Sequence, residues 1–111
     1  MKYDFVYLRH ILEAIQTIEE HLGGFSKNNF IQDKKTIDAV VRELEIIGEA
    51  ANNLSERFKQ DHPEIPFRDI IDMRNLLIHS YFGVNVDIVW DTCQENLPGL
   101  KRLLESITSK H

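Results

Sequence analysis

Apolar side chains recur at three- and four-residue steps along most of the chain, which is the spacing of amphipathic α-helices. The first run comprises Phe5, Leu8, Ile11, Leu12, Ile15, Ile18 and Leu22. Gly23 and Gly24 are predicted to end this helix, because glycine tolerates the left-handed conformation found after helix ends. No alternating strand pattern of useful length is present. We therefore expect an all-α fold, an up-and-down bundle of four to five helices with a kinked last helix.

The second run is the longest and predicts a helix over residues 33–60. Its apolar face comprises Ile37, Val40, Val41, Leu44, Ile47, Ala51, Leu54 and Phe58. The small residues Gly48 and Ala51 lie on or beside that face, where they would let another helix approach closely. Pro63 stops the helix from continuing. Residues 25–32 are expected to form a loop in which Phe25 and Phe30 fold back as apolar plugs.

The remaining sequence predicts two more helices. Pro66 suits the first turn of a helix over residues 66–81, which should stop near Gly83. Asn85 is a good N-cap for the last helix. Pro98 removes a backbone donor inside that helix, so a kink is expected there. The apolar stripe of the last helix comprises Val89, Trp90, Cys93, Leu97, Leu100, Leu104 and Ile107.

Length and cysteine content limit the organisation of the chain. With 111 residues, the sequence predicts a single domain over 1–111 with one core. A single cysteine, Cys93, cannot form an intrachain disulfide, and its place on an apolar stripe predicts a buried thiol. Charged residues interrupt the apolar ones throughout residues 1–20, which is unlike a signal peptide or a membrane span. These features favour a cytoplasmic protein.

The charge balance restricts any interaction with nucleic acid. The net charge is −5, which argues against broad electrostatic coating of DNA or RNA. A nucleic-acid function would therefore need a local basic site that grips a few phosphates.

Polar side chains suited to chemistry gather within residues 69–82. Arg74, Asn75, His79 and Tyr81 place a guanidinium, an amide, an imidazole and a phenol near a helix C-terminus. Asn75 and His79 are four residues apart and share a helix face, so the amide could hold the ring in one orientation. Arg74 and Tyr81, seven apart, also share a face.

Arg74 and His79 are harder to bring together, because five residues on a regular helix place them about 140° apart. The helix could loosen before Gly83, or the long arginine side chain could wrap around it. Alternatively, two copies of the segment could meet across a two-fold axis. Arg74 and His79 could also be solvated or paired with carboxylates such as Asp69 and Asp72, and spacing alone does not decide.

The segment Arg74-Asn75-x-x-x-His79-x-Tyr81 resembles the R-N-x-x-x-H-x-Y signature of HepT-like toxins in the HEPN superfamily. Residues 44–51 match that family's L-E-I-I-G-E-A-A block. Residues 65–70 are similar to its I-P-W-R-D-I block, with Phe67 in place of tryptophan. Val89-Trp90 and residues 97–100 resemble blocks of its last helix. The similarity thus covers nearly the whole chain in the expected order.

This resemblance implies a metal-independent endoribonuclease toxin that works as a homodimer with its site at the dimer interface. It implies that His79 is the general base or acid and that Arg74 stabilises charge on the phosphate. Asn75 would orient the histidine, and no cofactor is expected. It further implies a partner, a minimal nucleotidyltransferase antitoxin, which would inactivate the toxin by adenylylating Tyr81.

Other polar residues are weaker candidates. The resemblance makes Glu45 and Glu49 candidates to contact the motif helix and pair with Arg74, but solvated or structurally paired carboxylates are the preferred interpretation. They are therefore not counted as catalytic. The remaining histidines, His10, His21, His62 and His111, lack metal-ligand spacing, so no metal site is expected. No Gly-rich phosphate loop is present, so the chain is not expected to be the nucleotidyltransferase itself.

Two other functions remain open at this point. The chain could be a non-catalytic, substrate-presenting or binding subunit of a nucleotidyltransferase complex. It could also be a helical dimerisation module without chemistry, in which the polar groups of the motif would be exposed or salt-bridged apart from one another. The intact set of Arg74, Asn75, His79 and Tyr81 favours the enzyme.

Overall fold

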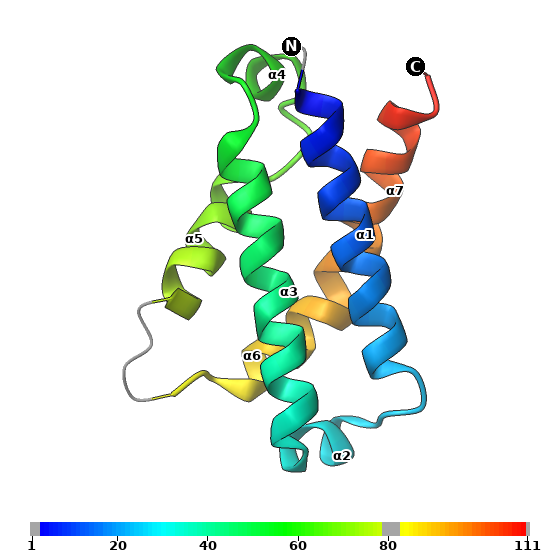
Figure 1. The fold of residues 1–111 in the computed structure, drawn as a ribbon, viewed down its shortest axis with the longest axis vertical. Helices are drawn as coiled ribbons and strands as arrows, with labels where there is room; N and C mark the ends of the chain where they lie inside the picture. The colour runs from blue at the N-terminus through cyan, green and yellow to red at the C-terminus, as the bar shows by residue number, and fades with distance from the viewer. Residues whose placement is uncertain (1–2, 79–82, 111) are drawn as a thin grey trace.

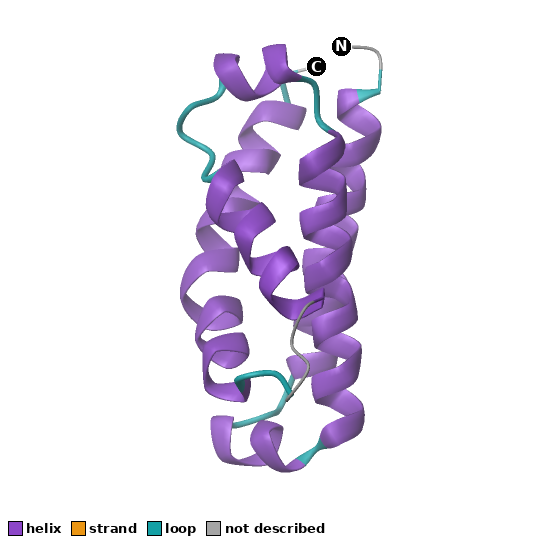
Figure 2. Ribbon diagram, turned by 90° about the vertical axis from the view of Figure 1, so that its left-hand side faces the viewer, coloured by secondary structure: helices purple, strands orange, loops and turns teal. Residues whose placement is uncertain are grey.

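The computed structural model describes residues 3–78 and 83–110, which form helices joined by short loops and contain no strand (Figures 1 and 2). The helical elements are α1 (Asp4–Leu22), α2 (Lys27–Gln32), α3 (Lys34–Asn53), α4 (Glu56–Asp61), α5 (Phe67–Ile78), α6 (Val86–Asp91), the π-helical turn η1 (Thr92–Asn96) and α7 (Leu97–Thr108). The long elements alternate in direction, as Figure 1 shows, so the expected up-and-down helical bundle is confirmed.

Helix α3 lies at the centre of the arrangement and packs against both α1 and α5, whereas α7 packs against α1 (Figure 1). The core between these helices includes the fully buried side chains of Leu8, Ile15, Phe30, Val40, Val89 and Leu104. All of these except Phe30 lie on the apolar stripes read from the sequence. None of the helices in the described part of the chain has the length and apolar character needed to span a lipid bilayer.

The predicted helix over residues 33–60 was wrong in one respect, because it breaks after Asn53 into α3 and α4. Leu54 adopts an extended conformation, and the Ser55 hydroxyl caps α4 by accepting the N–H of Phe58 at 3.1 Å. Leu54 and Phe58 are both buried, so the apolar spacing continued across the break and concealed it. The sequence signal for this helix break is the capping serine before the new helical turn, and the spacing of apolar residues does not reveal it.

The segment predicted as a loop over residues 25–32 contains α2, which is a correction to the expected element order. The Ser26 hydroxyl accepts the N–H of Asn29 at 3.1 Å and so caps this short helix. Phe30 is completely buried, and its ring lies 5.3 Å from that of Trp90. The expected plug is therefore present, but it is carried by a helix.

The last helix follows the prediction closely. The Asn85 side chain accepts the N–H of Ile88 at 3.2 Å and caps α6, and Cys93 is buried, which raises the pKa of its thiol to about 12. A kink was expected at Pro98; at this place the structure has the π-helical turn η1, which lies directly before α7. Since proline clashes with the carbonyl four residues earlier, at Gln94, a wider π-helical turn relieves the contact.

Asp4, at the start of α1, is buried and joins that helix to α4. Its carboxylate accepts both the backbone N–H and the hydroxyl of Ser55 at 2.8 Å. Burial alone would raise the pKa of Asp4, but hydrogen bonds to the carboxylate outweigh burial and hold the pKa below its ordinary value of 3.8.

A lowered pKa in the folded state stabilises the fold above the unfolded pKa, and this stabilisation is lost as the pH falls. Asp4→Asn should therefore lower the free energy of unfolding at neutral pH by about 1–3 kcal/mol. The difference between wild type and variant should shrink below about pH 4. Urea titrations at several pH values test this, and a difference independent of pH would contradict it.

Candidate active site around Arg74

Helix α5 carries the described part of the motif and is anchored at its first turn. The Pro66 carbonyl accepts the N–H of Ile70 at 3.1 Å, so this proline directly precedes the helix, close to its predicted place. Phe67 is buried, and its ring lies edge-on to Phe58 of α4 at 6.0 Å. Leu77 is buried near the other end of α5. The helix packs against α3, and Arg74 lies at that contact, against Gly48.

Gly48 of α3 makes the close approach of Arg74 possible. A Cβ atom at this position would lie 2.1 Å from Cβ and 2.6 Å from Cγ of Arg74, far inside van der Waals contact. The prediction that Gly48 lets another helix approach closely is thus confirmed. The partner surface is the base of the arginine side chain itself.

The guanidinium of Arg74 is held from two sides. Its Nη2 donates to a carboxylate oxygen of Glu49, and its Nη1 donates to Oδ1 of Asn75 at 3.0 Å. The Nε atom is buried and has no hydrogen-bond partner among the residues described. A guanidinium has five N–H donors, so these two bonds leave one hydrogen on each terminal nitrogen without a partner in the described part of the chain.

These contacts revise parts of the sequence interpretation. Arg74 pairs with Glu49, one of the two carboxylates that the resemblance made candidates for this pairing, and no ion pair among the described residues joins it to Asp69 or Asp72 of its own helix. Asn75 was assigned to orient His79; its side-chain carbonyl oxygen accepts from Arg74, and because His79 lies outside the described residues that assignment stays a prediction. Neighbouring residues on a helix do not share a face, so spacing could not indicate this contact, which depends on the bending of a long side chain.

His79 and Tyr81 lie outside the described residues, as does the predicted end of this helix at Tyr81. The approach of the His79 imidazole to the Arg74 guanidinium therefore remains a prediction. The position of Tyr81 remains a prediction as well. The nearest described residues are Ile78, the last described residue of α5, and Gly83, which has a positive φ of 102°.

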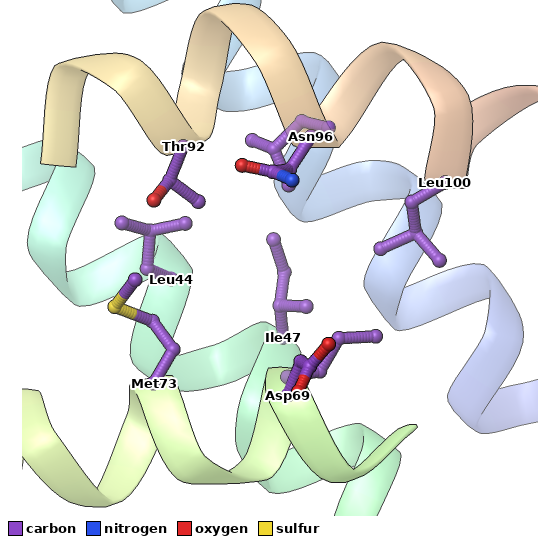
Figure 3. Close-up of a pocket in the computed structure, with 9 residues that line it drawn as sticks. Leu44, Ile47, Asp69, Met73, Thr92, Asn96 and Leu100 are labelled. Carbon is purple, nitrogen blue, oxygen red and sulfur yellow. The ribbon is translucent and has the colours of Figure 1, made fainter. Parts of the chain in front are cut away.

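A hollow of about 160 Å³ separates α5 from the last helix (Figure 3). Thr92 and Asn96 project into it from η1, opposite Ile47 and Met73, and Asp69 lies at its edge. Its remaining lining is Leu44, Ile70, Leu97 and Leu100. An apolar lining with a carboxylate does not favour a phosphate group, so this hollow is a poor RNA site compared with the surface at Arg74.

A second hollow, of about 200 Å³, is lined by residues of the motif helix α5 and by residues from 83–89, which follow the motif. Leu76 and Ile88 line it and are exposed to 56% and 42%. Its other lining residues are Met73, Leu77, Gly83, Val84, Asn85 and Val89. An exposed apolar surface of this kind is typical of a contact with another protein.

The described residues contain no group of three or more His, Cys, Asp or Glu side chains arranged to hold a metal ion. Two of the histidines weighed from the sequence, His10 and His62, instead lie against aromatic rings of Tyr7 and Phe58. His111 lies outside the described residues.

Similarity to known proteins shows the family of the chain. The model of a family described as "Ribonuclease HepT-like" matches residues 11–107. A Thermococcus cleftensis protein named "Probable ribonuclease HepT" is 50% identical over 101 residues, which cover 91% of this chain and 92% of the relative. A Caldanaerobacter subterraneus protein whose name begins "Putative RNase" is 41% identical over 110 residues, 99% of this chain and 98% of the relative. No solved structure gives a significant match. The chain belongs to the HepT-like ribonuclease family.

Proposed function

We propose that the chain is a metal-independent endoribonuclease in which Arg74 and His79 act on one phosphodiester. The observation that carries this proposal is the placement of Arg74. Its guanidinium is fixed at the α3–α5 contact by Glu49 and Asn75, and one hydrogen on each terminal nitrogen has no partner among the described residues. The family membership adds support, because the relatives carry the names "Probable ribonuclease HepT" and "Putative RNase".

The chemistry needs only groups that the motif supplies. His79 takes the proton of a ribose 2′-hydroxyl, because imidazole titrates near neutral pH. The 2′-oxygen then attacks the adjacent phosphorus and displaces the 5′-oxygen, which takes up a proton from water and leaves as a 5′-hydroxyl. A cyclic 2′,3′-phosphate remains on the other product. Negative charge grows on the phosphate oxygens in the transition state, and the planar guanidinium of Arg74 suits those oxygens.

We further propose that two chains pair through the apolar surface beside the motif. Leu76 and Ile88 expose large apolar areas next to the segment that carries His79. Covering this surface with a second copy would bring two motifs together and double the local positive charge in an acidic protein. The mass of the purified chain in solution, from light scattering, tests this pairing.

The proposed biological role is that of a toxin neutralised by a minimal nucleotidyltransferase. Expression of the chain alone should arrest bacterial growth, and co-expression with such a partner should restore it. Arrest that disappears with His79→Ala supports the toxin. Harmless expression of the wild-type chain would favour a non-catalytic subunit of a nucleotidyltransferase complex instead.

The proposed mode of neutralisation is adenylylation of the Tyr81 hydroxyl. Each AMP group adds bulk and negative charge close to Arg74 in sequence, which should repel the substrate phosphate. Intact mass spectrometry after co-expression with the nucleotidyltransferase should show additions of AMP mass that are absent from Tyr81→Phe. An unmodified wild-type chain, or an equally modified Tyr81→Phe variant, would contradict this mode.

A further inference from the structure

We infer that Glu49 is a positioning residue for Arg74, and that Gly48, Glu49 and Asn75 together form an arginine cradle that aims the guanidinium at a phosphate. This inference rests on the proposed ribonuclease function, because it takes the phosphate of an RNA substrate as the group that Arg74 binds. It goes beyond the sequence interpretation, which preferred a solvated or merely structural role for Glu49.

The cradle first fixes the base of the arginine side chain. The absence of a side chain at Gly48 leaves space that Cβ and Cγ of Arg74 occupy. The Nε atom beyond them is buried as well, and the whole arginine side chain is only 25% exposed. Most of its rotatable bonds are therefore enclosed between α3 and α5 before any substrate arrives.

The cradle then fixes the charged end of the side chain. Glu49 accepts from one terminal nitrogen and Asn75 from the other, so the plane of the guanidinium is held at both edges. A carboxylate partner gives a charge-assisted bond, which is stronger than a neutral one. Holding a reacting group in place before the reaction contributes directly to rate, because small misplacements of such a group are costly.

The exposure of Glu49 distinguishes a positioning role from a structural one. Its side chain is 54% exposed, and ion pairs at exposed positions contribute little to stability. Its negative charge also opposes the approach of a phosphate. Removal of Glu49 should therefore affect turnover and substrate affinity in opposite directions while leaving the fold intact.

The first experiment measures kcat and KM for RNA cleavage in Glu49→Ala and Glu49→Gln. Glu49→Ala should lower kcat about 10- to 100-fold, because the guanidinium loses one of its two fixed edges. Its KM should stay the same or fall by about two- to threefold, because a negative charge has been removed. Glu49→Gln keeps a hydrogen-bond acceptor of the same length and should recover most of the lost kcat.

Glu45 provides a matched control. It lies one helical turn before Glu49 on α3 and is half-buried, and no ion pair joins it to the other described residues. Glu45→Gln should leave kcat near the wild-type value. A Glu49→Ala variant that keeps wild-type kcat, or that loses activity only in proportion to a loss of folded protein, would overturn the inference.

A second measurement does not depend on activity. The buried Nε–H of Arg74 should give a slowly exchanging NMR signal in wild type, assigned by its loss in Arg74→Lys. In Glu49→Ala this signal should exchange faster, whereas an unchanged signal would overturn the cradle. If the wild-type chain cleaves no RNA, the proposed function fails, and the NMR measurement still decides whether Glu49 holds Arg74.

Discussion

Gly48→Ala is expected to force α5 away from α3 and to lower the free energy of unfolding by about 1–3 kcal/mol. The added methyl would overlap Cβ and Cγ of Arg74, which are close to the backbone of α5 and cannot swing aside as the end of a side chain could. Helix propensity predicts the opposite sign, because alanine favours a helix over glycine by about 1 kcal/mol. The steric overlap should outweigh the gain in helix propensity, because the added Cβ would lie far inside van der Waals distance of Cβ and Cγ of Arg74.

Gly99→Ala is a control for this substitution. Gly99 lies in α7, and among the described residues a Cβ atom there would meet only a terminal nitrogen of Arg102, at 3.9 Å. This variant should be as stable as wild type or more stable by up to about 1 kcal/mol. Equilibrium denaturation of both variants gives the comparison, and a Gly48→Ala variant with a wild-type midpoint would show that the helices approach less closely than described.

Arg74→Lys is expected to lower kcat for RNA cleavage by about 10²–10³-fold while the protein remains folded. Lysine keeps the positive charge, but it cannot bind Glu49, Asn75 and two phosphate oxygens with one planar group. Circular dichroism checks the fold, and cleavage of a defined RNA oligonucleotide gives the rate. A lysine variant with wild-type kcat would mean that charge alone is sufficient and that the cradle has no catalytic purpose.

Much of the fold was predictable because the apolar stripes of α1, α3 and α7 are long and regular. The cap at Asn85 and the irregularity before Pro98 were also readable, since each depends on one residue with a local effect. The break at Ser55 was not predicted. Leu54 and Phe58 stay buried on both sides of it, so the stripe gave no sign of the interruption.

The candidate site was only partly predictable from the sequence. The motif identified Arg74 and Asn75, and Gly48 was correctly associated with a close helix approach. The resemblance made Glu45 and Glu49 candidates to pair with Arg74. Which of them does so depends on how α3 and α5 are aligned, which a sequence pattern on either helix does not specify. The contact between Arg74 and Asn75 was missed because neighbours on a helix normally point in different directions.

The central claim is that Arg74 and His79 act together on one phosphodiester, and single-turnover cleavage tests it most directly. Wild type, Arg74→Ala, His79→Ala and the double variant would be compared on one RNA oligonucleotide in the presence of a metal chelator. We expect wild type to cleave and to leave a cyclic 2′,3′-phosphate. Each single variant should lose most of the activity, and the double variant should lose little more, because residues that act as a unit are not additive. Cleavage at the wild-type rate by either single variant would contradict the account.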